Sequence, residues 1–236
     1  KLHAYVGDLA DMASAEAVTQ QVLAAHGVVD ILVNNAGRSI RRAIENSYDR
    51  FHDFERTMQL NYFGCLKVTM TVLPKMVEQK RGHIINISSI GVLTNAPRFS
   101  AYVASKSALD AWTRCASSEF ADRGINFTTI NMPLVKTPMI APTKLYDSVP
   151  TLTPDEAADM ICGAIIHKPV RIATRLGITG QVLHALVPRV AQIIMNTTFR
   201  MFPDSAAAKK SEGGVLPSMP SADQVAFQQF MRGIYF

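Results

Sequence analysis

The chain has 236 residues, of which 48% are apolar and 18% charged, a composition typical of a globular protein that can bury a substantial core. The three cysteines, Cys65, Cys115 and Cys162, lie far apart without CxxC spacing, which argues against a disulfide framework or a zinc site and favours a reducing compartment. The net charge of +5 suits either an anionic ligand or simply a mildly basic enzyme, and no Lys/Arg run is long enough to predict a nucleic-acid partner.

No signal-peptide pattern is recognised at the start of the chain, so a cytoplasmic protein is expected. The most apolar late stretch, residues 182–195, is interrupted by His184, Pro188 and Arg189 and is too short to span a bilayer.

Strand-like runs alternate with amphipathic helical segments up to residue 173. The predicted strands are residues 3–6, 29–33 (VDILV), 83–87 (HIINI), 125–130 and 170–173, and the predicted helices are residues 15–26, 48–79, 100–122 and 154–167. Ser14 and Thr153 are candidate N-caps, Pro74 lies near the end of the bent second helix, and Gly124 stops the third. This alternation predicts an α/β fold with a Rossmann-type, doubly wound parallel sheet.

The alternation stops after Gly180. Residues 182–202 form a mostly apolar helical segment, residues 206–221 a Ser/Gly/Pro/Lys-rich connection, and residues 222–231 a short final helix. We therefore expect a first domain over residues 1–180 and extra C-terminal helices over residues 181–236, packed on the same domain. The apolar helix over residues 182–202 fits core or dimer packing, or else a substrate lid or a membrane-surface contact.

The start of the chain departs from the usual order of a dinucleotide-binding sheet. In such a sheet the first strand is central and carries a glycine-rich phosphate turn, but no GxxxGxG or GxGxxG opens this chain. We expect that an N-terminal βαβα portion ahead of Lys1 is missing, by truncation or disorder; a shorter fold is the alternative.

The residues that indicate chemistry are Ser89, Tyr102 and Lys106. Tyr102 and Lys106 are four residues apart in a predicted helix, so their side chains share one face. An ammonium group one turn away favours the phenolate and lowers the tyrosine pKa. Ser89 ends a predicted strand at the sheet edge where α/β proteins bind ligands, and its hydroxyl can donate to a carbonyl oxygen.

A Tyr-x-x-x-Lys pair alone is usually a solvated helix face. Here it belongs to an ordered set: Asn34-Asn35-Ala36-Gly37 after a buried strand, Asn61-Tyr62-Phe63-Gly64 within a helix, Ser89 thirteen residues before Tyr102, and the small residues Ser107 and Ala108 after Lys106. With this set, residues 4–168 resemble the short-chain dehydrogenase/reductase family.

The resemblance implies a Rossmann-type sheet, a nicotinamide cofactor and hydride transfer. It implies that Tyr102 is the general acid in reduction, or the base in oxidation, and that Ser89 orients the substrate carbonyl. Lys106 would lower the pKa of Tyr102 and hold the nicotinamide ribose, and Asn61 would hold a water molecule that links Lys106 to a proton relay.

The same resemblance implies cofactor contacts near the start of the chain. Asp8 and Leu9 would contact the adenine, and Asn35, Ala36 and Gly37 would pass under the adenosine ribose, where small residues allow a close approach. The structural alternatives are an Asx turn at Asp8 and an ordinary turn at residues 35–37.

Residues 132–138 (MPLVKTP) follow the fourth predicted strand and would bind the nicotinamide carboxamide through Pro133, Val135 and Thr137. Leu134 stands where the family usually has glycine, which puts the loop geometry in question. Either an apolar substrate pocket or ordinary loop packing would use Leu134, Met139 and Ile140.

Four stretches resemble a narrower group, the C-terminal reductase domain of bacterial fatty acyl-CoA reductases: residues 138–143 (PMIAPT), 148–159 (SVPTLTPDEAAD), 202–208 (FPDSAAA) and 230–236 (FMRGIYF). This implies reduction of a long-chain fatty aldehyde with NADPH, with NAD(H) as the alternative cofactor. It also implies a fused upstream domain that reduces an acyl thioester. The family further implies a homodimer or tetramer formed through the helices at residues 48–79 and 100–122.

Two other functions compete with this expectation. One is the reduction of a 3-oxoacyl or other hydroxy/keto substrate by the same residues. The other is a non-catalytic dinucleotide-fold module that serves assembly.

Overall fold

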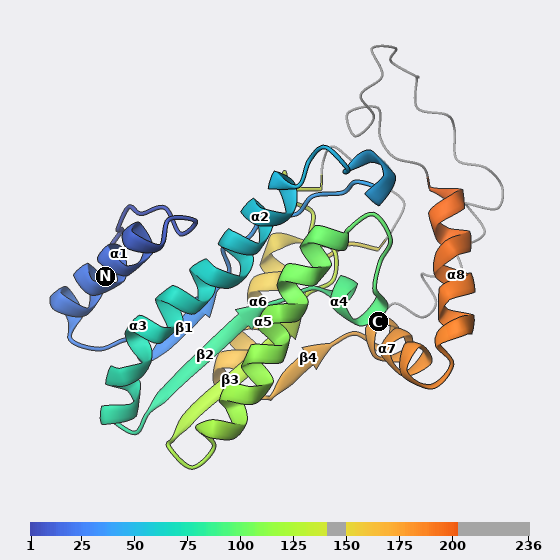
Figure 1. The fold of residues 1–236 in the computed structure, drawn as a ribbon. Helices are drawn as coiled ribbons and strands as arrows, with labels where there is room; N and C mark the ends of the chain where they lie inside the picture. Colours follow the sequence, from blue (N-terminus) through green and yellow to red (C-terminus); the bar gives the residue numbers. More distant parts are fainter. Residues whose placement is uncertain (141–149, 203–236) are drawn as a thin grey trace.

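The computed structural model describes residues 1–140 and 150–202. Its centre is a four-stranded parallel sheet in the order β1 (Ile31–Asn34), β2 (Gly82–Ile87), β3 (Ile125–Asn131) and β4 (Arg171–Ala173). Asn34 lies opposite Asn86, and Ile87 lies opposite Ile130. The carboxyl ends of the strands therefore meet at one edge of the sheet (Figure 1). This confirms the predicted α/β class.

Helices cover both faces of the sheet (Figure 1). The bounds are α1 (Met12–His26), α2 (His52–Met58), α3 (Cys65–Glu78), α4 (Ile90–Thr94), α5 (Ser100–Glu119), α6 (Pro154–His167), α7 (Arg175–Leu186) and α8 (Pro188–Met201), with a short 3₁₀ turn at Ile44–Asn46. Ile84 packs into a core with residues of α3 and α5, whereas the next residue, Ile85, packs into a second core with residues of α6. Adjacent residues of β2 thus face opposite layers, as a doubly wound sheet requires.

Three predicted elements differ from the structure. Residues 3–6 are not a strand, because among the described residues no strand pairs with them. The cap of α1 is Asp11, whose carboxylate accepts from the Ala13 amide at 3.0 Å, whereas the Ser14 hydroxyl accepts from the Asp8 amide at 2.8 Å. The predicted helix at 48–79 consists of α2, a π-helical turn (Gln59–Gly64) and α3.

The first helix after the sheet, α7, begins at Arg175 rather than at residue 182. The region predicted as one helix over residues 182–202 is two helices, because Pro188 lacks the amide hydrogen needed to continue α7 and instead starts α8. The predicted boundary at residue 180 lies within α7, and the division into two domains stays a prediction. The predicted segments at 206–221 and 222–231 lie outside the described residues. By contrast, α6 begins as predicted, with Thr153 and Glu156 forming a capping box.

Candidate active site

Ser89 and Tyr102 meet at the carboxyl end of β2. Ser89 is the second residue after β2 and caps α4, where its Oγ accepts from the Gly91 amide at 3.1 Å. Tyr102 lies in the first turn of α5, and the Ser89 side chain is close enough to its hydroxyl to act on the pKa of the phenol. The structure therefore brings together two of the predicted catalytic residues, from different elements.

Lys106 lies one turn further along α5 and is 3% exposed. Its Nζ donates to the Ile87 carbonyl at 2.7 Å, which fixes the ammonium group beneath the end of β2. Burial lowers the pKa of Lys106 below its usual range, while Cys65 and Asp110 act in the opposite direction.

The protonation of Tyr102 differs from the sequence expectation. Burial raises the pKa of the phenol above its ordinary value, the Ser89 side chain acts against this rise, and Asp110 adds to it. Burial is the largest influence on this pKa in the structure, and the lowering by Lys106 stays a prediction. Tyr102 consequently keeps its proton at neutral pH, the state that a general acid needs.

Asn61 lies in the π-helical turn and joins two other segments. Its Nδ2 donates to the Arg38 carbonyl at 2.8 Å and to the Ser105 Oγ at 2.9 Å, and its Oδ1 accepts from the Arg38 amide at 2.8 Å. The Ser105 hydroxyl in turn donates to the Tyr102 carbonyl at 2.7 Å. Asn61 thus holds the loop after β1 against α5, and its predicted water-holding role stays a prediction.

Two buried residues that the sequence reasoning missed complete this side of the site. The Asn131 Nδ2, at the end of β3, donates to the Asp110 Oδ2 at 3.2 Å and to the Ser89 carbonyl at 3.4 Å. Burial raises the pKa of Asp110, and the bond from Asn131 acts against that rise. Asp110 is four residues after Lys106 on the same helix, so its spacing alone could have revealed it.

Gly37 lies against the catalytic side chains. A Cβ at this position would come within 3.3 Å of the Asn61 Oδ1 and 3.4 Å of the Lys106 Nζ. The preceding residues, Asn35 and Ala36, are exposed at the carboxyl end of β1. These three residues therefore form a bare backbone edge beside a buried cation, which fits the predicted passage of a nicotinamide cofactor.

Asp8 and Leu9 approach the same region from the start of the chain. The Asp8 Oδ1 accepts from the Ala10 amide at 2.8 Å, which is the Asx turn given as the alternative to adenine binding. Leu9 passes so close to Gly64 that a Cβ there would collide with the Leu9 carbonyl. The adenine contact stays a prediction.

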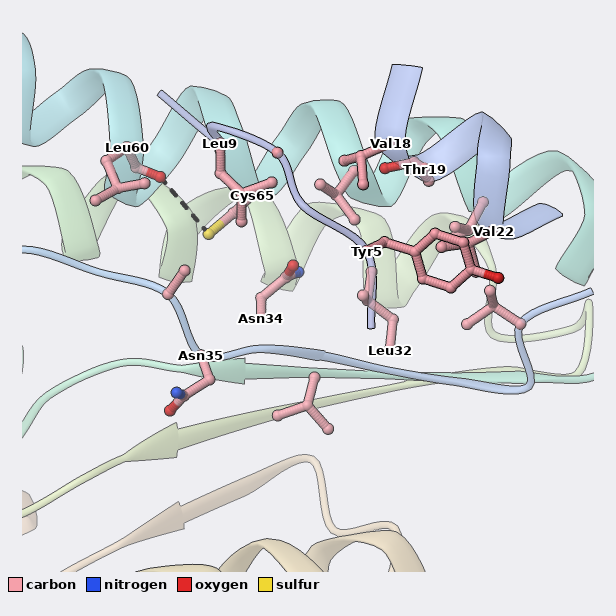
Figure 2. A pocket seen from close by; sticks show the side chains of 16 residues that line it. Tyr5, Leu9, Val18, Thr19, Val22, Leu32, Asn34, Asn35, Leu60 and Cys65 are labelled. Carbon is pink, nitrogen blue, oxygen red and sulfur yellow. Dashed lines mark hydrogen bonds between the residues drawn. The ribbon is translucent and has the colours of Figure 1, made fainter. Parts of the chain in front are cut away.

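A cavity of about 390 Å³ lies between α1, α3 and the outer edge of β1. Leu9, Asn35 and Ala36 line it together with mainly apolar side chains such as Val18, Val22 and Leu32 (Figure 2). The structure thus brings residues from both predicted adenosine-contacting segments to one cavity.

The segment after β3 is held by residues just before α6. The Leu134 carbonyl accepts from the Leu152 amide at 2.8 Å, and the Lys136 amide donates to the Leu152 carbonyl at 2.8 Å. The backbone of Leu134 does not adopt a positive φ, so leucine is compatible with this loop. The Thr137 hydroxyl donates to the Val135 carbonyl at 3.4 Å.

Pro133 is buried beside this loop. The predicted contacts of Pro133, Val135 and Thr137 with the nicotinamide stay predictions.

A second cavity, of about 540 Å³, lies beside α5 and α8 and is lined by residues including Ile44, Pro97, Val103 and Phe199. Neither of the two cavities is lined by the predicted pocket residues Leu134, Met139 and Ile140. Within residues 1–140 and 150–202, no group of three or more potential ligand side chains could hold a metal ion, and no helix could cross a membrane.

Comparison with known proteins supports the chemistry that this geometry suggests. The family model for short chain dehydrogenases matches residues 1–146. The chain is 58% identical over 201 residues to a fatty acyl-CoA reductase of Acinetobacter baylyi, covering 85% of this chain and 68% of that protein. It is 47% identical over 189 residues to the fatty acyl-CoA reductase Rv0547c of Mycobacterium tuberculosis, covering 80% and 64%.

Solved structures agree with these matches. A short-chain dehydrogenase from Streptomyces avermitilis aligns with a TM-score of 0.67 and 27% identity, covering 82% of this chain and 78% of that one. A 3-ketoacyl-(acyl-carrier-protein) reductase from Brucella melitensis complexed with NADH aligns with a TM-score of 0.63 and 27% identity, covering 68% and 69%. The chain therefore belongs to the short-chain dehydrogenase/reductase family, whose enzymes are oxidoreductases that use a nicotinamide dinucleotide.

Proposed function

We propose that this protein reduces a long-chain fatty aldehyde to the alcohol with NADPH. The observation that carries the proposal is the convergence of Ser89, Tyr102 and the buried Lys106 at the carboxyl end of β2. The two relatives named fatty acyl-CoA reductases favour an apolar aldehyde as the substrate.

In this mechanism the side chains handle the carbonyl oxygen and its proton. Ser89 orients the oxygen by donating a hydrogen bond, and Tyr102, held protonated by burial, delivers the proton. The bound NADPH supplies the hydride for the carbonyl carbon. Lys106 offers a buried positive charge close to Gly37, where it stabilises negative charge that develops on Tyr102.

Cofactor binding is assigned to the exposed backbone edge after β1 and to the segment after β3. Asn35, Ala36 and Gly37 would lie beneath the adenosine ribose, and Val135 and Thr137 would reach the carboxamide. Gly37 supports this assignment, because any side chain there would enter the space shared with Asn61 and Lys106.

The second cavity is the candidate site for the apolar chain of the substrate. Val103, which follows Tyr102 in α5, lines it, and a Cβ at Gly91 would lie 3.5 Å from the Val103 Cγ2 and 3.3 Å from the Ser89 Oγ. Val103 therefore links the lining of the cavity to the two residues proposed to contact the reacting carbonyl. A fused thioester-reductase domain and assembly into a homodimer or tetramer stay predictions.

The structural similarity to a 3-ketoacyl reductase keeps a second function in view. A substrate panel separates the two: the intact protein is assayed with hexadecanal, butanal and a 3-oxoacyl thioester, each with NADPH and with NADH. The proposal expects the highest kcat/KM for hexadecanal with NADPH. Turnover of the thioester alone would select the alternative, and a failure to bind either cofactor would favour a non-catalytic module.

A further inference from the structure

The helices α7 and α8 lie next to each other at one end of the described part of the chain (Figure 1), and each exposes large apolar side chains. In α7 these residues follow a spacing of four, and in α8 they occupy positions i, i+3 and i+4, so each helix presents them along one side. We call this set the α7–α8 apolar face; it consists of Ile178, Val182, Leu186, Val190, Ile193 and Ile194.

The α7–α8 apolar face is not the side by which these helices pack on the protein. In α7, Gly177 packs against Leu93 so closely that a Cβ there would come within 2.8 Å of its Cδ1. In α8, Ala191 is buried, and the Phe199 ring lies 3.9 Å from the Arg98 guanidinium carbon. Because other residues anchor the helices, Ile193, which is 60% exposed, is left facing outward.

The charged side chains of α7 and α8 themselves all have one sign. Residues 175–202 contain Arg175, Arg189 and Arg200 and one histidine, His184, but no aspartate or glutamate. All three arginines are exposed. A helical pair that combines exposed apolar side chains with arginine and no acid is typical of segments that lie in the interface of an anionic membrane.

We propose that the α7–α8 apolar face docks onto the surface of a lipid bilayer that contains anionic headgroups. Contact with the same face of a second protein copy is less favourable. A symmetric contact would bring arginines together, and neither copy has an acidic residue in α7 or α8 to neutralise them. The helices lie in the interface rather than span it. The same α8 contributes Phe199, from the side by which it packs on the protein, to the second cavity.

Vesicle co-sedimentation of the intact protein tests this proposal. Vesicles of phosphatidylcholine alone are compared with vesicles that contain equal parts of phosphatidylglycerol. We expect binding to the anionic vesicles that weakens at high salt, and a fall of at least tenfold in the partition coefficient for Ile193→Asp. Arg189→Glu should reduce binding to the anionic vesicles and remove much of its salt dependence.

The matched control is Ile166→Asp, because Ile166 is also an isoleucine at a helix surface, 71% exposed, but belongs to α6. It should bind vesicles like the wild type, with thermal unfolding confirming that each variant is folded. Absence of wild-type binding, or equal loss in both aspartate variants, would overturn the proposal. It would also be overturned if the wild type does not bind vesicles and Ile193→Asp instead converts a dimer to a monomer in light scattering.

Discussion

The candidate site has two halves, the residues around Lys106 and the residues that follow β1. They differ in how many hydrogen bonds fix their side chains. Around Lys106, buried groups from β2, β3, α5 and the π-helical turn bond to one another, and Asn61 and Asn131 each connect separate elements. Around β1, Asn35 and Ala36 are exposed and border a cavity. The proposed catalytic half is thus preorganised by internal hydrogen bonds, whereas the proposed cofactor half offers mainly accessible backbone.

The largest expected effect is a loss of activity caused by Lys106→Met in the half around Lys106. Removing the buried ammonium should lower kcat for aldehyde reduction by about 10²–10⁴-fold, the usual contribution of proton-transfer catalysis. Steady-state kinetics measure this loss, and the exposed Lys80→Met serves as the control. Near wild-type turnover of Lys106→Met would contradict the role given to the catalytic half.

Asn131→Ala tests whether the hydrogen bonds of the catalytic half position Ser89. The change removes the donor to the Asp110 carboxylate and the Ser89 carbonyl, so we expect a loss of about 1–3 kcal/mol in the free energy of unfolding. The pKa of Asp110 should rise further, so the acid limb of the kcat–pH profile should shift to higher pH. A purely structural residue would change denaturation alone; Asn196→Ala, exposed on α8, should change neither.

Gly37→Ala probes the boundary between the halves. The new methyl group would press on Asn61 and Lys106, so NADPH affinity should fall about tenfold, equivalent to about 1.4 kcal/mol. Calorimetric titration measures this change. Gly163→Ala is the control, because a Cβ there meets no atom within 4 Å; unchanged affinity in both variants would remove Gly37 from the cofactor site.

The smallest expected effect is on the pH dependence of stability, and it comes from a residue outside the candidate site. His83 is buried in β2, its Nε2 lies 2.9 Å from the Thr128 Oγ1, and burial, assisted by Lys168, lowers its pKa below 6.5. Its contribution to stability is therefore complete above pH 6.5 and is lost as the pH falls through the lowered folded-state pKa.

Denaturant unfolding at a series of pH values measures this contribution. His83→Gln should flatten the decline in stability below pH 6.5, whereas the exposed His184→Gln should leave it unchanged. An unaltered slope in His83→Gln would show that other groups cause the decline.

Local patterns predicted much of the fold and part of the site. The apolar runs at β1, β2 and β3 and the Thr153 capping box are determined by neighbouring residues, so they can be read directly from the sequence. The spacing of Tyr102 and Lys106 on one helix is equally local. The assignment of Tyr102, Lys106 and Ser89 to one catalytic site became specific only through the family resemblance.

Features that depend on distant contacts were missed. Gln59–Gly64 contains no proline to mark its π-helical turn, and the turn lies where the Leu9 carbonyl presses on Gly64. Asn131 becomes recognisable only when β3 and α5 lie side by side. The raised pKa of Tyr102 likewise depends on burial, which a helical spacing does not reveal.

The central claim, that Tyr102 gives the proton to the carbonyl oxygen, is tested most directly by single-turnover reduction of hexadecanal in the intact protein and in Tyr102→Phe. The substitution keeps the ring and removes only the hydroxyl beside Ser89. The account predicts that NADPH affinity and unfolding temperature stay at the wild-type level while the rate of NADPH oxidation falls by about 10²–10⁴-fold. An unchanged rate in Tyr102→Phe would contradict it.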